Sequence, residues 1–198
     1  MRLSVASGEA VATVADQFAI PARCTHRPLA GGRVVPHISV VLADGRPVLG
    51  AVHRSKAMRC ISEFRCQICG DPLGSPMVVF VTDAQLADRY SPEAALHPEC
   101  AAYSRKACPV LAGQVDTLRG VDRHVGSACS EPGCDCAGWV ASDGPSVRGR
   151  EVGRWWAVWL DSYAIAVNER HEVHGLSWRD VKPRRVREVE TAGGGSRG

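Results

Sequence analysis

Four residues of the types that bind zinc stand in two short pairs in this sequence. Cys66 and Cys69 are separated by two residues, and His97 and Cys100 follow with the same spacing. Thiolate and imidazole are ligands that zinc prefers, and four of them complete a tetrahedron. The spacing therefore predicts a structural zinc site. A catalytic zinc would need one of the four to be replaced by water, so the pattern favours a structural role.

The elements around these pairs have to bring them together. Gly70 directly after the first pair suits a tight knuckle, because a residue without a Cβ lets the backbone turn beneath the metal. The apolar, β-branched run at residues 77–82 predicts a strand. Pro98 suits the first position of a helix over residues 99–107, which places His97 near its N-cap and Cys100 in its first turn. Their i, i+3 spacing puts both on one face. A knuckle, a hairpin and a helix of this kind form a treble-clef arrangement.

A second group of cysteines lies in a stretch rich in turn-forming residues and comprises Cys129, Cys134 and Cys136. Three thiolates within eight residues indicate a second zinc site if a fourth ligand comes from elsewhere. The candidates for that ligand are His124, Cys24, Cys60, Cys108 and His26. The alternative is a loop that carries reactive thiols. We therefore expect Zn²⁺ as the cofactor, with one ion at the first site and a second ion if this cluster is complete.

Charge and composition place few limits on the partner. The net charge of +3 is too small to indicate nucleic acid by itself, and 21 of the 24 basic residues are arginine, which is typical of a GC-rich genome. The candidate nucleic-acid contacts cluster near the end of the chain and are Arg179, Lys182, Arg184, Arg185 and Arg187. Acidic residues interrupt this cluster, so a solvated face is the competing interpretation. An exposed tryptophan among Trp155, Trp156 and Trp159 would provide a stacking surface for a base.

The compartment is expected to be the cytoplasm. The opening residues 1–22 include Glu9 and Asp16 and contain no unbroken apolar run, so they do not resemble a signal peptide. No stretch predicts a membrane span. Nine cysteines in a reducing compartment favour metal binding over disulfides.

The predicted fold class is α+β, with a small zinc-stabilised domain and a Trp-containing β region. We expect an N-terminal segment at 1–22, a treble-clef-like zinc domain at 23–113, a Cys-cluster and Trp-rich region at 114–190 packed on it, and a disordered tail at 191–198. Strands are predicted at 34–42 and 47–52, joined by a hairpin turn, and at 186–189. A helix is predicted at 53–61, and the strands predicted at 155–160 and 163–167 are expected to pair with each other.

Part of the chain resembles a family of small zinc-binding proteins from actinobacteria and their phages, whose function is uncharacterised. The matching pieces are RPL at 27–29, a G-R-x-V-P segment at 32–36, CQICGDPLG at 66–74 and ALHPECAAYSRKACPVL at 95–111. They span residues 27–111, a little under half of the chain. The resemblance implies a metal-binding intracellular protein, phage-encoded or host-encoded, and implies no reaction. His37 and Ile38 depart from the aromatic residues of the family pattern.

Together these features predict a zinc-stabilised cytosolic binding or regulatory module whose partner is a nucleic acid or a protein. The alternative is an enzyme, a metal-dependent hydrolase or nuclease acting on nucleic acid. No nucleophile motif, paired carboxylates or phosphate-binding glycine loop supports that alternative, and the histidines expected beside a nuclease hairpin are missing. We therefore favour the module.

Overall fold

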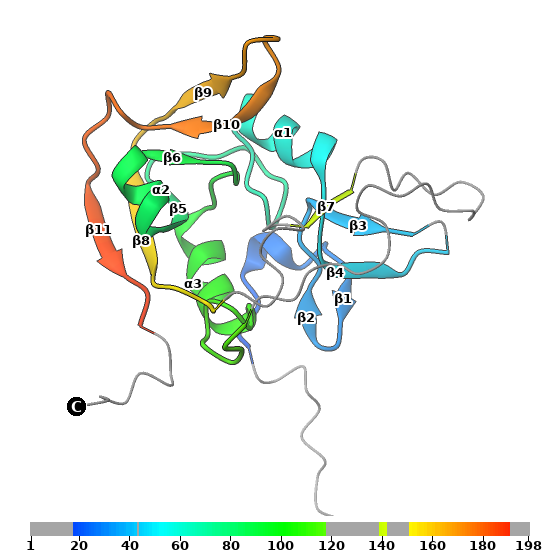
Figure 1. Ribbon diagram of the computed structural model, residues 1–198. Coiled ribbons are helices and arrows are strands. Elements are labelled where there is room, and N and C mark those ends of the chain that lie inside the picture. The colour runs from blue at the N-terminus through cyan, green and yellow to red at the C-terminus, as the bar shows by residue number, and fades with distance from the viewer. Residues whose placement is uncertain (1–17, 43, 118–138, 142–150, 191–198) are drawn as a thin grey trace, which may run out of the picture.

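The computed structural model describes residues 18–42, 44–117, 139–141 and 151–190 (Figure 1). They form a mixed α and β structure with small antiparallel sheets and few helices. The helices are η2 (Ala22–Cys24, a single 3-10 turn), α1 (Arg54–Ser62), α2 (Asp83–Asp88) and α3 (Pro98–Ala107). The strands are β1 (Leu29–Ala30), β2 (Arg33–Val34), β3 (Ser39–Val41), β4 (Pro47–His53), β5 (Met77–Thr82), β6 (Tyr90–Ser91), β7 (Trp139–Ala141), β8 (Trp155–Leu160), β9 (Ala164–Val167), β10 (Val173–Ser177) and β11 (Arg185–Glu188).

The strands of the described residues form a two-stranded ribbon, β1-β2, and three three-stranded sheets. The sheet that organises the core has the order β11-β8-β5, and β5 pairs with β8 along six residues, from Met77 opposite Leu160 to Thr82 opposite Trp155. The other two have the orders β6-β10-β9 and β3-β4-β7. Figure 1 shows β11, β8 and β5 side by side.

Side chains alternate across the central sheet, because successive residues of a strand point to opposite faces. On β5, Val78 and Phe80 enter one hydrophobic cluster, whereas Val79 and Val81 enter another. The first cluster includes residues of α3, among them Tyr103, and the second includes residues of α1. The sheet thus separates two cores, and α3 and its metal-ligand candidates belong to the first.

Most of the strands expected from the sequence are confirmed. β3 and β4 form the predicted hairpin, and β5, β8 and β11 lie where strands were predicted. The single strand predicted at 34–42 is wrong in its extent, because residues 35–38 belong to no strand and Val34 belongs to β2. The helix expected at 53–61 is α1, and the helix expected at 99–107 is α3. The tryptophans of β8 alternate as a strand requires, since Trp155 and Trp159 pack on the first cluster and Trp156 packs on the second.

The expected pairing of residues 155–160 with 163–167 is wrong. β8 instead lies between β5 and β11, and β9 pairs with β10. In the turn after β8, the Asp161 carboxylate accepts a hydrogen bond from the Ser75 hydroxyl and forms an ion pair with Arg184. Tyr163 then donates its hydroxyl to the carbonyl of Ile61, at 2.8 Å, which directs the chain toward α1.

Each three-stranded sheet combines strands from both sides of residue 114. β5, β6 and the β3-β4 hairpin come from before it, and β7 to β11 come from after it. The regions predicted at 23–113 and 114–190 therefore share hydrogen-bonded sheets, and their division into domains stays a prediction. The tail at 191–198 and most of the segment at 1–22 lie outside the described residues.

Within the described part of the chain, no helix has the length and apolar character needed to cross a membrane.

Candidate metal centre

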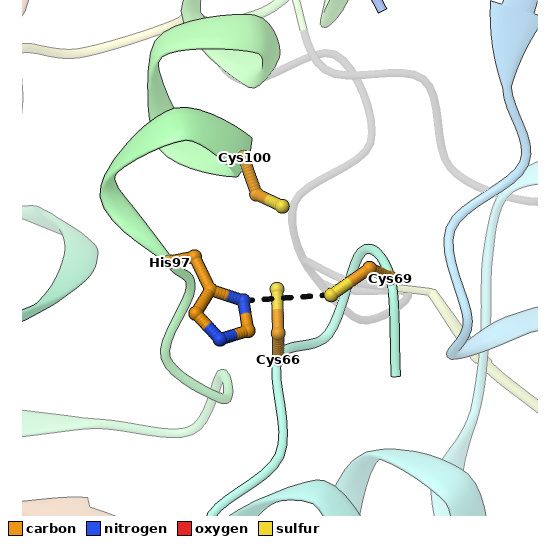
Figure 2. A group of neighbouring side chains, drawn as sticks. All are labelled: Cys66, Cys69, His97 and Cys100. Carbon is orange, nitrogen blue, oxygen red and sulfur yellow. Dashed lines mark hydrogen bonds between the residues drawn. The ribbon is translucent and has the colours of Figure 1, made fainter. Parts of the chain in front are cut away.

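The four predicted zinc ligands form one buried cluster. One donor atom from each of Cys66, Cys69, His97 and Cys100 lies within 4.8 Å of the others, and their exposed fractions are between 0% and 4%. Figure 2 shows Cys66 and Cys69 on the loop that follows α1, and His97 and Cys100 at the start of α3. The structure therefore brings together two pairs that are almost thirty residues apart in the sequence.

The knuckle that carries the first pair is closed by backbone hydrogen bonds. The Gly70 N–H donates to the carbonyl of Cys66 at 2.9 Å, and the Cys66 N–H donates to the carbonyl of Asp71 at 2.9 Å. The Asp71 N–H points back at Cys69 Sγ, at 3.4 Å. Gly70 has φ of +87°, and a Cβ there would lie 2.7 Å from Nδ1 of His37. Both the turn and the close approach of His37 require glycine.

The second pair is placed by the start of α3. His97 is the N-cap residue, Pro98 occupies the first turn, and Cys100 lies one turn from His97 as predicted. The preceding residue, Leu96, is anchored to β5 by two hydrogen bonds with Val78, both 2.8 Å long. The Gln67 N–H also donates to the Ala95 carbonyl at 3.2 Å. These bonds set the knuckle and the helix at a fixed separation.

The imidazole of His97 is oriented for metal binding through Nδ1. Its Nε2–H donates to the carbonyl of Pro72 at 2.9 Å, and Nδ1 lies 3.4 Å from Cys69 Sγ. A hydrogen bond from one ring nitrogen fixes the tautomer and leaves the lone pair of the other nitrogen for the metal. The carbonyl that holds the ring belongs to the knuckle itself, so the two halves of the site support each other.

The donor set fits zinc in kind and in spacing. Zinc bonds of about 2.3 Å to sulfur and about 2.0 Å to nitrogen, at tetrahedral angles, place a sulfur about 3.5 Å from a nitrogen. The Cys69 Sγ to His97 Nδ1 distance of 3.4 Å agrees with that value. Three thiols and one imidazole form a common structural zinc set, and the structure is compatible with one ion at this site.

The electrostatics of the cluster also favour a cation. Hydrogen bonds from the Cys100 thiol and from the backbone N–H groups of Cys69 and His97 lower the pKa of Cys66 to about 5. Donation to Cys66, together with burial, raises the pKa of Cys100, and burial raises the pKa of Cys69. One thiolate is therefore favoured without metal, and a divalent ion would displace the protons of the other two thiols.

A fifth cysteine, Cys24, lies against the cluster. Its Sγ is 3.8 Å from Cys100 Sγ, and its side chain is fully buried. It does not belong to the group of four whose donor atoms all lie within 4.8 Å of one another. The sequence suggested Cys24 only as a candidate fourth ligand of the second cluster. No local signal could have placed it here, since it is 76 residues from Cys100.

The segment around Cys24 also touches the other ligands. A ring nitrogen of His26 lies 3.2 Å from the carbonyl oxygen of Cys69. Arg23 forms an ion pair with Glu99 on α3, at 2.5 Å. Both contacts tie residues 23–26 to the elements that carry the candidate ligands.

The three cysteines of the predicted second site, Cys129, Cys134 and Cys136, lie outside the described residues, as does His124. Among the described residues, one group of possible ligands is present, the four-residue cluster. Cys60 is buried in the other core, and Cys108 lies at the C-terminal end of α3. The second site stays a prediction.

The predicted nucleic-acid contacts are all exposed but do not form an uninterrupted basic surface. Arg185 and Arg187 lie on β11, and Arg185 stacks over the Trp159 ring, 5.6 Å from its centroid. Arg184 forms an ion pair with Asp161 at 2.6 Å, and Arg179 donates to a backbone carbonyl. Lys182 lies in the loop between β10 and β11. Their role in binding stays a prediction.

Comparison with protein-family models finds no match to this chain, and comparisons with curated proteins and with solved structures find none either. The resemblance to the zinc-binding family of actinobacteria and their phages therefore stays a prediction.

Proposed function

We propose that this protein is a zinc-stabilised binding module in which the metal has a structural role. The observation that carries the proposal is the closed, buried set of four ligands, Cys66, Cys69, His97 and Cys100. A structural zinc uses four protein ligands, whereas a catalytic zinc keeps one position for water or substrate. Burial of all four donors and the hydrogen bond from His97 to Pro72 support the structural role.

The proposed scaffold is of the treble-clef type. Three features support it: the knuckle around Gly70, the paired Val78 and Leu96 that return the chain toward the knuckle, and α3, which begins at the second ligand pair. The connection from Val78 to Leu96 also includes α2 and β6, so it is longer than a simple hairpin. The knuckle and the helix are the parts that hold the metal.

The proposed role of the module is to present a surface to a protein or a nucleic acid in the cytoplasm. Binding energy at a structural zinc site is largely folding energy, so the metal would stabilise the surface rather than react there. The basic and aromatic residues of β8 and β11 are the proposed contacts if the partner is a nucleic acid. Asp161, which forms an ion pair with Arg184, would reduce the positive charge of that surface.

Metal analysis of protein purified without chelator tests the proposal. We expect about one equivalent of zinc at this site, or about two if the second site also binds, and Co²⁺ substitution should give the absorption of a tetrahedral site with three sulfurs and one nitrogen. Cys69→Ser should remove one ion and lower the thermal stability. Cys24→Ser is the matched control, because Cys24 is equally buried beside the cluster but lies outside the set of four.

Three outcomes would contradict the proposal. A zinc content of less than about half an equivalent would show that the protein is not stabilised by zinc. If Cys24→Ser loses the metal and Cys69→Ser retains it, the ligands proposed here are wrong. A Co²⁺ spectrum that shows a coordinated, exchangeable water would favour the alternative of a metal-dependent hydrolase or nuclease.

A further inference from the structure

Cys24 is a buried thiol that lies against the candidate metal centre without belonging to it. Its Sγ is 3.8 Å from Cys100 Sγ, and its exposed fraction is 0%. It is not one of the four residues whose donor atoms all lie within 4.8 Å of one another. A buried cysteine usually packs as a small apolar side chain. This one also lies within hydrogen-bond reach of a candidate ligand, so packing does not describe it fully.

Contacts of the neighbouring residues hold Cys24 in this place. Its N–H donates to the carbonyl of Pro21 at 2.8 Å, which closes the 3-10 turn η2. The preceding residue, Arg23, forms an ion pair with Glu99 in the first turn of α3. The turn that carries Cys24 is therefore joined to the helix that carries Cys100.

The sulfur atoms of the cluster differ in the groups that can donate to them. Ligands of a metal are commonly oriented by hydrogen bonds from the groups around them. Backbone N–H groups donate to Cys66 and to Cys69, the two knuckle thiols. The neighbour of Cys100 Sγ is a side chain instead, the thiol of Cys24. Each of the three sulfurs thus has a group able to donate to it, and for Cys100 that group comes from 76 residues away in the sequence.

The direction of the hydrogen bond between Cys24 and Cys100 follows from zinc binding. Without metal, either thiol can be the donor. With zinc held by the four ligands, Cys100 is a thiolate and can only accept, so Cys24, which keeps its proton, is the donor. Three thiolates and one neutral imidazole around Zn²⁺ leave a net negative charge in a buried site. A buried charge requires hydrogen-bond partners, and Cys24 supplies one.

We propose that Cys24 is a positioning residue of the metal centre, whose S–H donates to the Cys100 thiolate and thereby strengthens zinc binding. This role rests on the proposed function, because it requires zinc at the site. It gives a fifth cysteine a part that is neither ligation nor packing. Loss of an outer hydrogen bond of this kind typically lowers metal affinity by about 10- to 100-fold. A thiol is a weak donor, so we expect the lower end of that range.

Zinc competition with a chromophoric chelator, on the full chain at one fixed pH, tests the proposal. Cys24→Ala removes the donor and should weaken zinc binding by about tenfold. Cys24→Ser keeps a hydroxyl donor and should stay within about threefold of the unmodified chain. The control, Cys60→Ala, removes a thiol that is equally buried but lies in the other core, so it should leave the zinc affinity unchanged. All four proteins should bind the same number of ions at saturating zinc.

The absorption spectrum of the Co²⁺-substituted protein separates a hydrogen bond from packing. A hydrogen bond lowers the energy of the thiolate lone pairs, so its loss should shift the sulfur-to-cobalt charge-transfer band to longer wavelength. Cys24→Ala should show this shift, whereas Cys24→Ser and Cys60→Ala should not. If Cys24→Ala does not fold, Cys24→Val and Cys24→Thr take its place as two variants of equal shape, of which only the threonine can donate.

Several results would overturn the proposal. If Cys24→Ala binds zinc as tightly as the unmodified chain, or if Cys24→Ala and Cys24→Ser weaken binding equally, Cys24 only packs against the cluster. If both variants bind fewer ions at saturation, Cys24 is a ligand and not a positioning residue. The proposed function is tested separately by the zinc content of the unmodified chain, and an unmodified chain without zinc would overturn both proposals.

Discussion

Replacement of Gly70 by alanine should destabilise the protein through two separable effects at the knuckle. Gly70 has φ of +87°, where an alanine costs about 1–2 kcal/mol because its Cβ crowds the following carbonyl. The added Cβ would also lie 2.7 Å from Nδ1 and 2.9 Å from Cγ of the His37 ring, closer than real Cβ contacts. Overpacking of this kind typically costs about 1–3 kcal/mol. The two effects together predict a loss of about 2–5 kcal/mol.

Gly45→Ala is the matched control for the backbone effect. Gly45 has a similar φ of +84°, but a Cβ there would meet nothing within 4 Å. Its substitution should therefore cost only about 1–2 kcal/mol. Urea unfolding of the two variants at one fixed concentration of free zinc gives the difference, which measures the contact with His37.

A double-mutant cycle with His37→Ala isolates the contact directly. In the His37→Ala background the ring is absent, so Gly70→Ala should cost no more than Gly45→Ala does. The zinc affinity of Gly70→Ala should fall as well, because the Gly70 N–H closes the turn that carries Cys66. The proposed contact with His37 is refuted if Gly70→Ala and Gly45→Ala lower the free energy of unfolding equally. It is also refuted if removal of the His37 ring leaves the destabilisation by Gly70→Ala unchanged.

Three further measurements test other parts of the account. Burial raises the pKa of Cys60 to about 11 from a usual value of 9.0, so the folded protein keeps a proton that the unfolded chain loses. The free energy of unfolding should therefore fall as pH rises from about 9 to about 11, by at most about 1.4 kcal/mol per pH unit. The fall should be shallower in Cys60→Ala. Urea titrations that give the same dependence of the unfolding free energy on pH in both proteins would contradict this. If the second zinc site exists, zinc stoichiometry should be about two and should drop to about one in the triple serine variant of Cys129, Cys134 and Cys136. If β11 contacts nucleic acid, binding should weaken more than about tenfold between low and physiological salt. The double variant Arg185→Ala, Arg187→Ala should reduce this salt dependence, whereas the control Arg46→Ala should not. Absence of binding at low salt would leave a protein as the partner.

The candidate metal centre could be predicted from the sequence because the spacing within each ligand pair is local information. Each ligand pair lies within four residues, and Pro98 marks the start of α3 with no help from the rest of the chain. The knuckle turn likewise depends on Gly70 alone, since few other residues adopt a positive φ readily. Short-range geometry of this kind is the same in any fold that contains it. The structure brings Cys66, Cys69, His97 and Cys100 into one buried cluster, and their binding of zinc stays a prediction.

Only the tertiary structure decided which strands are neighbours. Residues 155–160 and 163–167 are adjacent in the sequence and looked like a hairpin, but β8 is buried between β5 and β11. Apolar side chains of β5 and β8 lie together on both faces of the sheet. The free energy gained by this burial outweighs the smaller entropy cost of the short loop that a hairpin with residues 163–167 would need. A pattern of alternating residues indicates a strand but does not name its partner.

The contact of Cys24 with Cys100 could likewise not be predicted from the sequence. Cys24 is 76 residues from Cys100. A contact over that distance depends on how every intervening element packs, which no local pattern records. The sequence by itself determined the ligands and the elements that carry them. The packing of distant segments decided which strands pair and which residues pack against the candidate metal centre, because long-range contacts form only when the whole chain folds.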